Sequence, residues 1–287
     1  MVNGSAYWRL MRFHRPVGLL LLLWPTLWAL WLANHGMPPW QLLIIFIDGV
    51  IVTRAAGCIL NDLADRNFDG FVERTKDRPL ACGELTVQQA KKALWLLSGL
   101  ALVLVVQLNA LSFLLSLLAA ALALSYPYLK RISHFPQVVL GLAFAMPIPM
   151  AFAASGKALS VHCWLLFAIG VIWPLMYDTA YAINDQIDDA KLGLKSTALW
   201  FGERSAVFIG VLQILLMGLW IWLGLLASFT SFFWFALGLN ALGFIYQQIL
   251  LQQAYAFKAF LTNQWLGGIL WLGIALSLQT LTPVVAM

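Results

Sequence analysis

The chain has 287 residues, of which 62% are hydrophobic and only 10% are charged. Soluble globular proteins carry about 25% charged residues, so this composition argues against that class and favours a membrane protein. The net charge of +5 follows the topology pattern described below and therefore does not indicate binding to nucleic acid.

Apolar runs separated by short polar breaks predict an all-α protein with about nine transmembrane helices. A spanning helix needs about 20 mostly apolar residues, and in hydrocarbon a helix satisfies each backbone polar group within its own segment. No small-residue cleavage site follows the first run, so no cleavable signal peptide is expected. We interpret residues 1–287 as a single domain embedded in the lipid bilayer. The predicted helices lie near residues 17–33, 41–59, 93–107, 111–126, 136–154, 163–184, 205–226, 231–251 and 265–282.

The distribution of basic residues predicts the orientation of these helices. With the N-terminus in the cytosol, alternate connections lie on the cytosolic side, and all of the 17 Lys and Arg residues except Lys157 fall there. Basic residues concentrate on the cytosolic side of membrane proteins. The asymmetry predicts a cytosolic N-terminus and supports the odd number of spans.

The acidic residues gather in two segments. All of the 12 Asp and Glu residues except Asp48 lie within 62–84 or 178–203, at or beyond the cytosolic ends of two predicted helices. Acidic groups close to the membrane are costly and are usually functional. The two segments are therefore the candidate site.

Helical spacing aligns the acids of each segment. On a helix continuing through the first segment, Asn61, Asp65 and Asp69 share one face, and Asp62 joins the two aspartates at i+3 and i+7. In the second segment the residues on one face are Asp178, Tyr181, Asp185 and Asp189.

Like charges one helical turn apart repel, so carboxylates stacked on one face need a cation. Oxygen ligands without His or Cys indicate magnesium, which commonly bridges one or two carboxylates to substrate phosphates. Two opposed faces of this kind predict a clamp on a diphosphate.

With these motifs the chain resembles the UbiA superfamily of intramembrane prenyltransferases. The superfamily is marked by an N-D-x-x-D-x-x-x-D motif, matched at 61–69, and by a second aspartate motif, matched at 178–189. Further supporting stretches are LLLWPTLWALW at 21–31, RAAGC at 54–58, RTKDRPLACG at 74–83, YPYLKRISHFPQVVLG at 126–141 and IPMAFAA at 148–154. The similarity extends from end to end and is greatest to bacterial members that prenylate 4-hydroxybenzoate.

The resemblance implies a magnesium-dependent enzyme that transfers a polyprenyl group from its diphosphate to 4-hydroxybenzoate in ubiquinone biosynthesis. It also implies a multi-pass protein of the bacterial inner membrane, with a central cavity whose site faces the cytosol. The implied metal residues are Asn61, Asp62, Asp65, Asp69, Asp178, Asp185 and Asp189, and the implied catalytic residues are Asp65, Asp69, Asp185 and Arg131. Candidates for binding substrate are Arg12, Arg54, Arg74, Arg78, Tyr128, Lys130 and Tyr181, with Arg54 and Arg12 for the benzoate carboxylate.

Two alternatives stay open at this point. A sister enzyme of the same superfamily would prenylate a different aromatic acceptor. A transporter of an anionic substrate would also place charges within broken helices, although its binding site is expected at the membrane midplane. The acids here lie at one membrane side, which favours the enzyme.

Overall fold

The computed structural model of the protein describes residues 4–67, 69–71 and 75–281. Within these residues the chain is helical and contains no strand, which confirms the all-α prediction. The helices are α1 (Gly4–Leu10), α2 (Val17–Asn34), α3 (Trp40–Asp65), η1 (Asp69–Phe71), α4 (Val87–Val105), α5 (Ala110–Leu129), α6 (Pro136–Ala145), α7 (Pro147–Ala154), α8 (Val161–Lys191), α9 (Thr197–Phe201), η2 (Gly202–Arg204), α10 (Ser205–Leu226), α11 (Ser231–Gln252) and α12 (Ala256–Leu281).

Each predicted span coincides with helical structure. In the described part of the chain, eight segments are long and apolar enough to cross a membrane, with α6 and α7 counted as one. The helix α4 is not among the eight, and it carries Lys91 and Lys92 near its start. The protein is therefore a multi-pass membrane protein.

The helices that carry the acidic segments are longer than hydropathy predicts. The helix α3 continues to Asp65 where the apolar run ends near 59, and α8 continues to Lys191 where the run ends near 184. Hydropathy marks the entry into polar surroundings, whereas the backbone hydrogen bonds of a helix persist beyond that boundary. The span predicted at 136–154 is divided at Met146, because Pro147 has no N–H to donate to the preceding turn.

One prediction about the first acidic segment is wrong. The helix does not continue through Asp69: α3 ends at Asp65, and Asp69 begins the separate 3₁₀ turn η1. The spacing argument therefore holds for Asn61 and Asp65 but not for Asp69, whose position depends on tertiary contacts.

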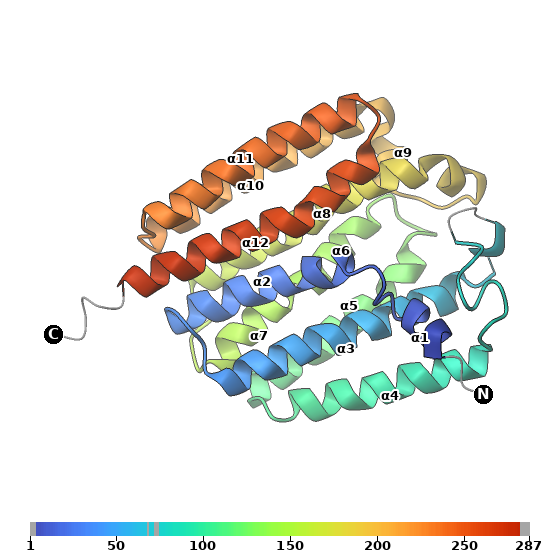
Figure 1. The fold of residues 1–287 in the computed structure, drawn as a ribbon, viewed down its shortest axis with the longest axis horizontal. Coiled ribbons are helices and arrows are strands. Elements are labelled where there is room, and N and C mark those ends of the chain that lie inside the picture. Colours follow the sequence, from blue (N-terminus) through green and yellow to red (C-terminus); the bar gives the residue numbers. More distant parts are fainter. Residues whose placement is uncertain (1–3, 68, 72–74, 282–287) are drawn as a thin grey trace.

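Six helices enclose the centre of the molecule. The helix α2 packs against α3 and α12, α5 packs against α3 and α6, and α8 packs against α6 and α12. The helices α10 and α11 lie outside this ring, against α8 and α12 respectively. Figure 1 shows the long helices side by side, with α1 and α9 at one end of the bundle and the end of α12 at the other.

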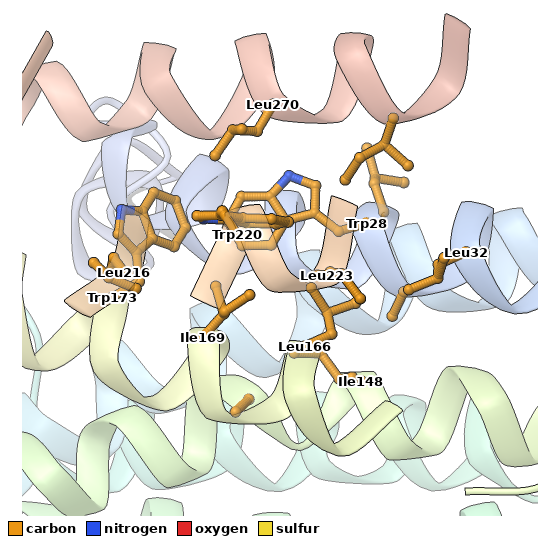
Figure 2. Packing of buried hydrophobic residues seen from close by; sticks show 14 of the residues in the cluster. Trp28, Leu32, Ile148, Leu166, Ile169, Trp173, Leu216, Trp220, Leu223 and Leu270 are labelled. Carbon is orange, nitrogen blue, oxygen red and sulfur yellow. The ribbon is translucent and has the colours of Figure 1, made fainter. Parts of the chain in front are cut away.

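Indole rings join three helices in the buried core. The ring of Trp28 (α2) lies 5.0 Å from those of Trp173 (α8) and Trp220 (α10), measured between centroids, and Figure 2 shows these rings among Leu and Ile side chains. The Nε1 of Trp28 donates to the backbone oxygen of Gly267 on α12 at 3.0 Å. Close packing and such hydrogen bonds hold helices together in lipid, where the hydrophobic effect between helices is absent.

The short helix α1 covers one end of the bundle. Its Ala6 and Leu10 are fully buried and pack with Ala55 and Ile59 of α3 in a small apolar cluster. Arg9 also forms an ion pair with Glu84, in the connection between α3 and α4. These contacts fix the chain that leads from α1 into the cavity described next.

Candidate active site

A cavity of about 360 Å³ opens within the ring of six helices. Its lining residues come from the starts of α2 and α12, from most of α6, from the later parts of α3, α5 and α8, and from the connections next to them. It therefore lies toward one end of the bundle and not at its middle. The predicted site residues that line it are Arg12, Arg54, Asn61, Asp62, Asp65, Asp69, Arg78, Lys130, Asp178, Tyr181, Asp185 and Asp189.

In the described part of the chain, Asn61 and Asp65 of the first motif present oxygen atoms without hydrogen-bond partners to the cavity, and Oδ2 of Asp62 is also buried without one. Asn61 and Asp65 are one turn apart on the last part of α3, so they share a face. The Oδ1 of Asn61 is buried without a hydrogen-bond partner. Within the described residues, the carboxylate of Asp65 forms no hydrogen bond or ion pair. A buried acceptor without a donor is unfavourable, and a cation would satisfy both groups.

The other two aspartates of the first motif are held by arginines. The Oδ1 of Asp62 lies 2.7 Å from Nη2 of Arg12 and 3.2 Å from Nη1 of Arg78, and the Asp62 side chain is only 1% exposed. The same Nη1 of Arg78 donates to both carboxylate oxygens of Asp69, at 2.9 and 2.8 Å. We call Arg12, Asp62, Arg78 and Asp69 the arginine–aspartate network.

The arginine–aspartate network, and not a continuing helix, positions Asp69 at the cavity. Burial alone would lower the pKa of Arg78, but its neighbours Asp62 and Asp69 outweigh that effect and raise the pKa above its ordinary value. Arg78 therefore stays charged, and its hydrogen bonds hold Asp69 at the cavity wall beyond the end of α3. Arg12 has a left-handed backbone conformation with φ of 60°, which turns the chain between α1 and α2 toward Asp62.

The second motif lies along α8 as predicted. Asp178, Tyr181, Asp185 and Asp189 follow one another on the face that lines the cavity. In the described part of the chain, Asp178 forms no hydrogen bond or ion pair, whereas Oδ1 of Asp185 accepts from Nδ2 of Asn184 at 3.1 Å. The ring of Tyr181 packs against Phe260 of α12, with centroids 5.1 Å apart.

The oxygen groups of the two motifs fit a magnesium ion that is shared with a substrate. Among the described residues, no three His, Cys, Asp or Glu side chains converge to enclose a metal by themselves. Magnesium usually takes only one or two carboxylates and completes its shell with water and substrate phosphates. Asn61, Asp65 and Asp178 provide such unpaired oxygens on α3 and α8 of the same cavity.

Arg54 is a further cation in the lining of the same cavity. It projects from α3 four residues before Cys58, which is buried in the cavity wall, and is itself half-buried. Within the described residues its guanidinium has no hydrogen-bond or ion-pair partner. An unpaired charge removed from water is costly, so the site favours an anion at this position.

Two predicted site residues, Arg131 and Tyr128, are not among the residues that line the cavity. Arg131 donates instead to the backbone oxygen of Ala64 at 3.0 Å, at the end of α3. Tyr128 is 54% exposed and lies near Arg131, whose Cζ is 5.9 Å from the ring centroid. Arg74 lies outside the described residues.

Two tyrosines that were not predicted do line the cavity. Tyr126 lies there in place of Tyr128, and the Nζ of Lys130 is 5.0 Å from the centroid of its ring. The spacing contains the signal: Tyr126 is one turn before Lys130 and shares its face, whereas Tyr128 is two residues away from both. Tyr177 precedes Asp178 on α8, and its buried hydroxyl has no hydrogen-bond partner in the described structure.

Curated relatives share about half of the sequence. The chain is 50% identical over 275 residues to a 4-hydroxybenzoate octaprenyltransferase from Providencia stuartii, covering 95% of this chain and 96% of the relative. It is 49% identical over 276 residues to the 4-hydroxybenzoate octaprenyltransferase of Edwardsiella ictaluri, covering 95% and 96% of the two chains.

Solved structures share the fold at lower identity. A UbiA homologue from Aeropyrum pernix K1 superposes with a TM-score of 0.80 at 24% identity, covering 90% of this chain and 97% of the other. A UbiA homologue from Archaeoglobus fulgidus bound to GPP and Mg²⁺ superposes with a TM-score of 0.70 at 20% identity, covering 96% and 99%. The UbiA prenyltransferase family matches residues 22–266 of this sequence. With that match and relatives that are half identical over nearly the full length, the chain belongs to the UbiA prenyltransferase family.

Proposed function

We propose that this protein transfers a polyprenyl group, octaprenyl in its relatives' reaction, from its diphosphate to 4-hydroxybenzoate in ubiquinone biosynthesis. The observation that carries the proposal is that, in the described part of the chain, one cavity holds both oxygen atoms without partners and a guanidinium without a partner. Unpaired oxygens of α3 and α8 suit a metal-bound diphosphate, and the unpaired guanidinium of Arg54 suits the carboxylate of the acceptor. The names of the half-identical relatives support the same acceptor.

Asn61, Asp65 and Asp178 are the first candidates to hold magnesium, and Asp185 and Asp189 continue the same face of α8. Magnesium bound there would neutralise charge on the departing diphosphate. Asp62 and Asp69 belong to the motif as well. Arg78 holds both carboxylate oxygens of Asp69, so we assign Asp69 to positioning of the site. Arginines hold only Oδ1 of Asp62, and its unpartnered Oδ2 leaves Asp62 a further candidate ligand.

The remaining residues bind and orient the two substrates. Lys130 and Arg78 line the acidic part of the cavity and provide positive charge for diphosphate oxygens. As the bond from the prenyl carbon to diphosphate oxygen breaks, the ring carbon ortho to the hydroxyl bonds to that carbon, and the ring proton is then lost. The faces of Tyr126 and Tyr181 favour the cationic allyl group. Burial within the bundle keeps water from that cation.

We further propose that the protein resides in a bacterial inner membrane with its N-terminus and this cavity toward the cytosol. The nearly complete placement of Lys and Arg on one side supports that orientation. The soluble acceptor would then enter from the cytosol, and the polyprenyl chain would remain in the bilayer.

Purified protein in lipid nanodiscs tests this proposal directly. Given labelled 4-hydroxybenzoate and octaprenyl diphosphate with Mg²⁺, it is expected to form the prenylated acid, identified by mass. Removal of divalent metal with a chelator is expected to abolish product, and added Mg²⁺ to restore it. The control uses chelator already saturated with Mg²⁺. Undiminished turnover after metal removal would contradict the metal assignment, and no product under any condition would contradict the acceptor.

The substitution Arg54→Ala is expected to raise KM for 4-hydroxybenzoate about tenfold or more, with KM for the prenyl diphosphate little changed. Loss of a charge-assisted hydrogen bond has about this effect on binding. Steady-state kinetics with each substrate varied in turn measures both constants. Arg204→Ala, which removes an exposed cation outside the cavity, is the control. Unchanged dependence on the acceptor in Arg54→Ala would show that another group holds the carboxylate.

A further inference from the structure

The guanidinium of Arg54 lies against the backbone of α2 at Gly18. A Cβ atom built on Gly18 would stand 2.5 Å from Nε and 2.7 Å from Cζ of Arg54, with Nη2 nearer still. Non-bonded heavy atoms are normally about 3.5–4.0 Å apart. Any side chain at position 18 would therefore occupy the space in which the Arg54 guanidinium now lies.

The obstacle at Gly18 consists only of the far end of one flexible side chain. All three of the nearest atoms belong to the Arg54 guanidinium group, and none is backbone. Gly141 differs, because its nearest neighbours are backbone atoms of Val171 on α8. Alanine at 141 would disturb the packing of α6 on α8, whereas alanine at 18 would be accommodated by moving Arg54.

Both residues belong to the cavity. Gly18 and Arg54 line it together with Leu21 of α2 and Tyr177 of α8, and Gly18 is buried. Alanine is a better helix former than glycine, and Gly18 lies inside α2 without a positive φ. Helix formation therefore gives no reason for glycine at this position, whereas the placement of Arg54 does.

We propose that Gly18 is a positioning residue for the acceptor: it leaves open the space that lets the Arg54 guanidinium lie against α2 and face the carboxylate of 4-hydroxybenzoate. This inference rests on the proposed function of Arg54. A methyl group at position 18 displaces the guanidinium from the wall into the cavity, where it no longer meets the carboxylate in the same geometry. Gly18 thereby determines the preference of the site for an acidic acceptor.

The test compares two acceptors, 4-hydroxybenzoate and its uncharged amide, in nanodisc-reconstituted protein. Gly18→Ala is expected to raise KM for 4-hydroxybenzoate about three- to tenfold while KM for the prenyl diphosphate stays within twofold. The ratio of kcat/KM for the acid to that for the amide should fall by a similar factor. This ratio does not depend on the fraction of enzyme that is folded, so a less stable variant still gives a decisive result.

Gly49→Ala is the matched control, because Gly49 lies on α3 five residues before Arg54 and a Cβ there meets nothing within 4 Å. Gly18→Ala should raise KM for 4-hydroxybenzoate by a smaller factor in the Arg54→Lys variant than in the unmodified protein. Lysine lacks the wide guanidinium that the methyl group displaces. Additive losses would overturn the proposal.

The outcomes separate the two levels of the proposal. If Arg54→Ala weakens acceptor binding but Gly18→Ala behaves like Gly49→Ala, the inference about Gly18 is wrong and the proposed function stands. If Gly18→Ala lowers kcat/KM equally for the acid and the amide, Gly18 is only a packing residue. If Arg54→Ala itself leaves the ratio unchanged, the assignment of Arg54 is wrong.

Discussion

Asp65→Asn and Asp178→Asn are each expected to lower kcat by on the order of a hundredfold or more. Each substitution removes one negatively charged ligand of the proposed magnesium site, on α3 in the first case and on α8 in the second. Loss of one preorganised electrostatic contact to a developing charge has an effect of this size. Both side chains line the cavity, and within the described residues neither forms a hydrogen bond or an ion pair. Their loss should therefore affect catalysis much more than folding.

The measurement is kcat as a function of Mg²⁺ concentration, together with the melting temperature in the same lipid or detergent. The variants should need more Mg²⁺ and should melt within a few degrees of the unmodified protein. Asp48→Asn is the control, since Asp48 lies on α3 but is exposed and does not line the cavity. Normal turnover in well-folded Asp65→Asn and Asp178→Asn would refute the two-motif metal site.

Arg78→Ala is expected to destabilise the protein by about 3–5 kcal/mol and to remove nearly all activity. Removing one partner of a buried ion pair leaves an uncompensated buried charge, and this cost is typically of that size. Here two carboxylates are affected, since Arg78 contacts both Asp62 and Asp69. The 3₁₀ turn η1 would lose the contact that holds Asp69 in the cavity wall.

Thermal unfolding and turnover, measured on the same samples, check this expectation. Arg66→Ala is the control, because Arg66 follows α3 directly but is exposed, and its side chain donates to the backbone oxygen of Leu63 at 3.4 Å. Adding Asp69→Asn to Arg78→Ala should recover part of the lost stability by removing one unpaired charge. If the double variant is less stable than Arg78→Ala, the arginine–aspartate network does not act as described.

The two acidic motifs show what local spacing determines and where it stops. Along α8, helical periodicity correctly placed Asp178, Tyr181, Asp185 and Asp189 at one cavity, because the helix continues through the whole motif. In the first motif helical periodicity applies only as far as Asp65, where α3 ends. Asp69 arrives at the cavity through Arg78, nine residues later, and no periodic pattern encodes a contact across an irregular connection.

The different roles of Arg12 and Arg54 also depend on a contact that local spacing does not encode. Arg12 and Arg54 were both candidates for the acceptor carboxylate in the sequence, because both are cations near the same membrane surface. Their difference is a tertiary contact: Arg12 is paired with Asp62, fifty residues away, while Arg54 has no such partner in the described structure. The presence of Tyr126 in the cavity lining, in contrast, could have been predicted from the sequence, because Tyr126 lies one turn before Lys130 on α5.

The length of α8 bears on the depth in the membrane at which the polyprenyl diphosphate contacts the protein. Its 31 residues rise about 46 Å at 1.5 Å per residue, whereas the hydrocarbon layer is only about 30 Å thick. Counted from Val161, about 20 residues are enough to cross that layer, which puts the end of the crossing close to Asp178 and leaves Asp185 and Asp189 beyond it. A polyprenyl diphosphate dissolved in the bilayer already holds its charged head at that level and its tail below it. A donor that diffuses within the bilayer to the cavity therefore keeps its tail in the hydrocarbon and its charged head at the level of these carboxylates.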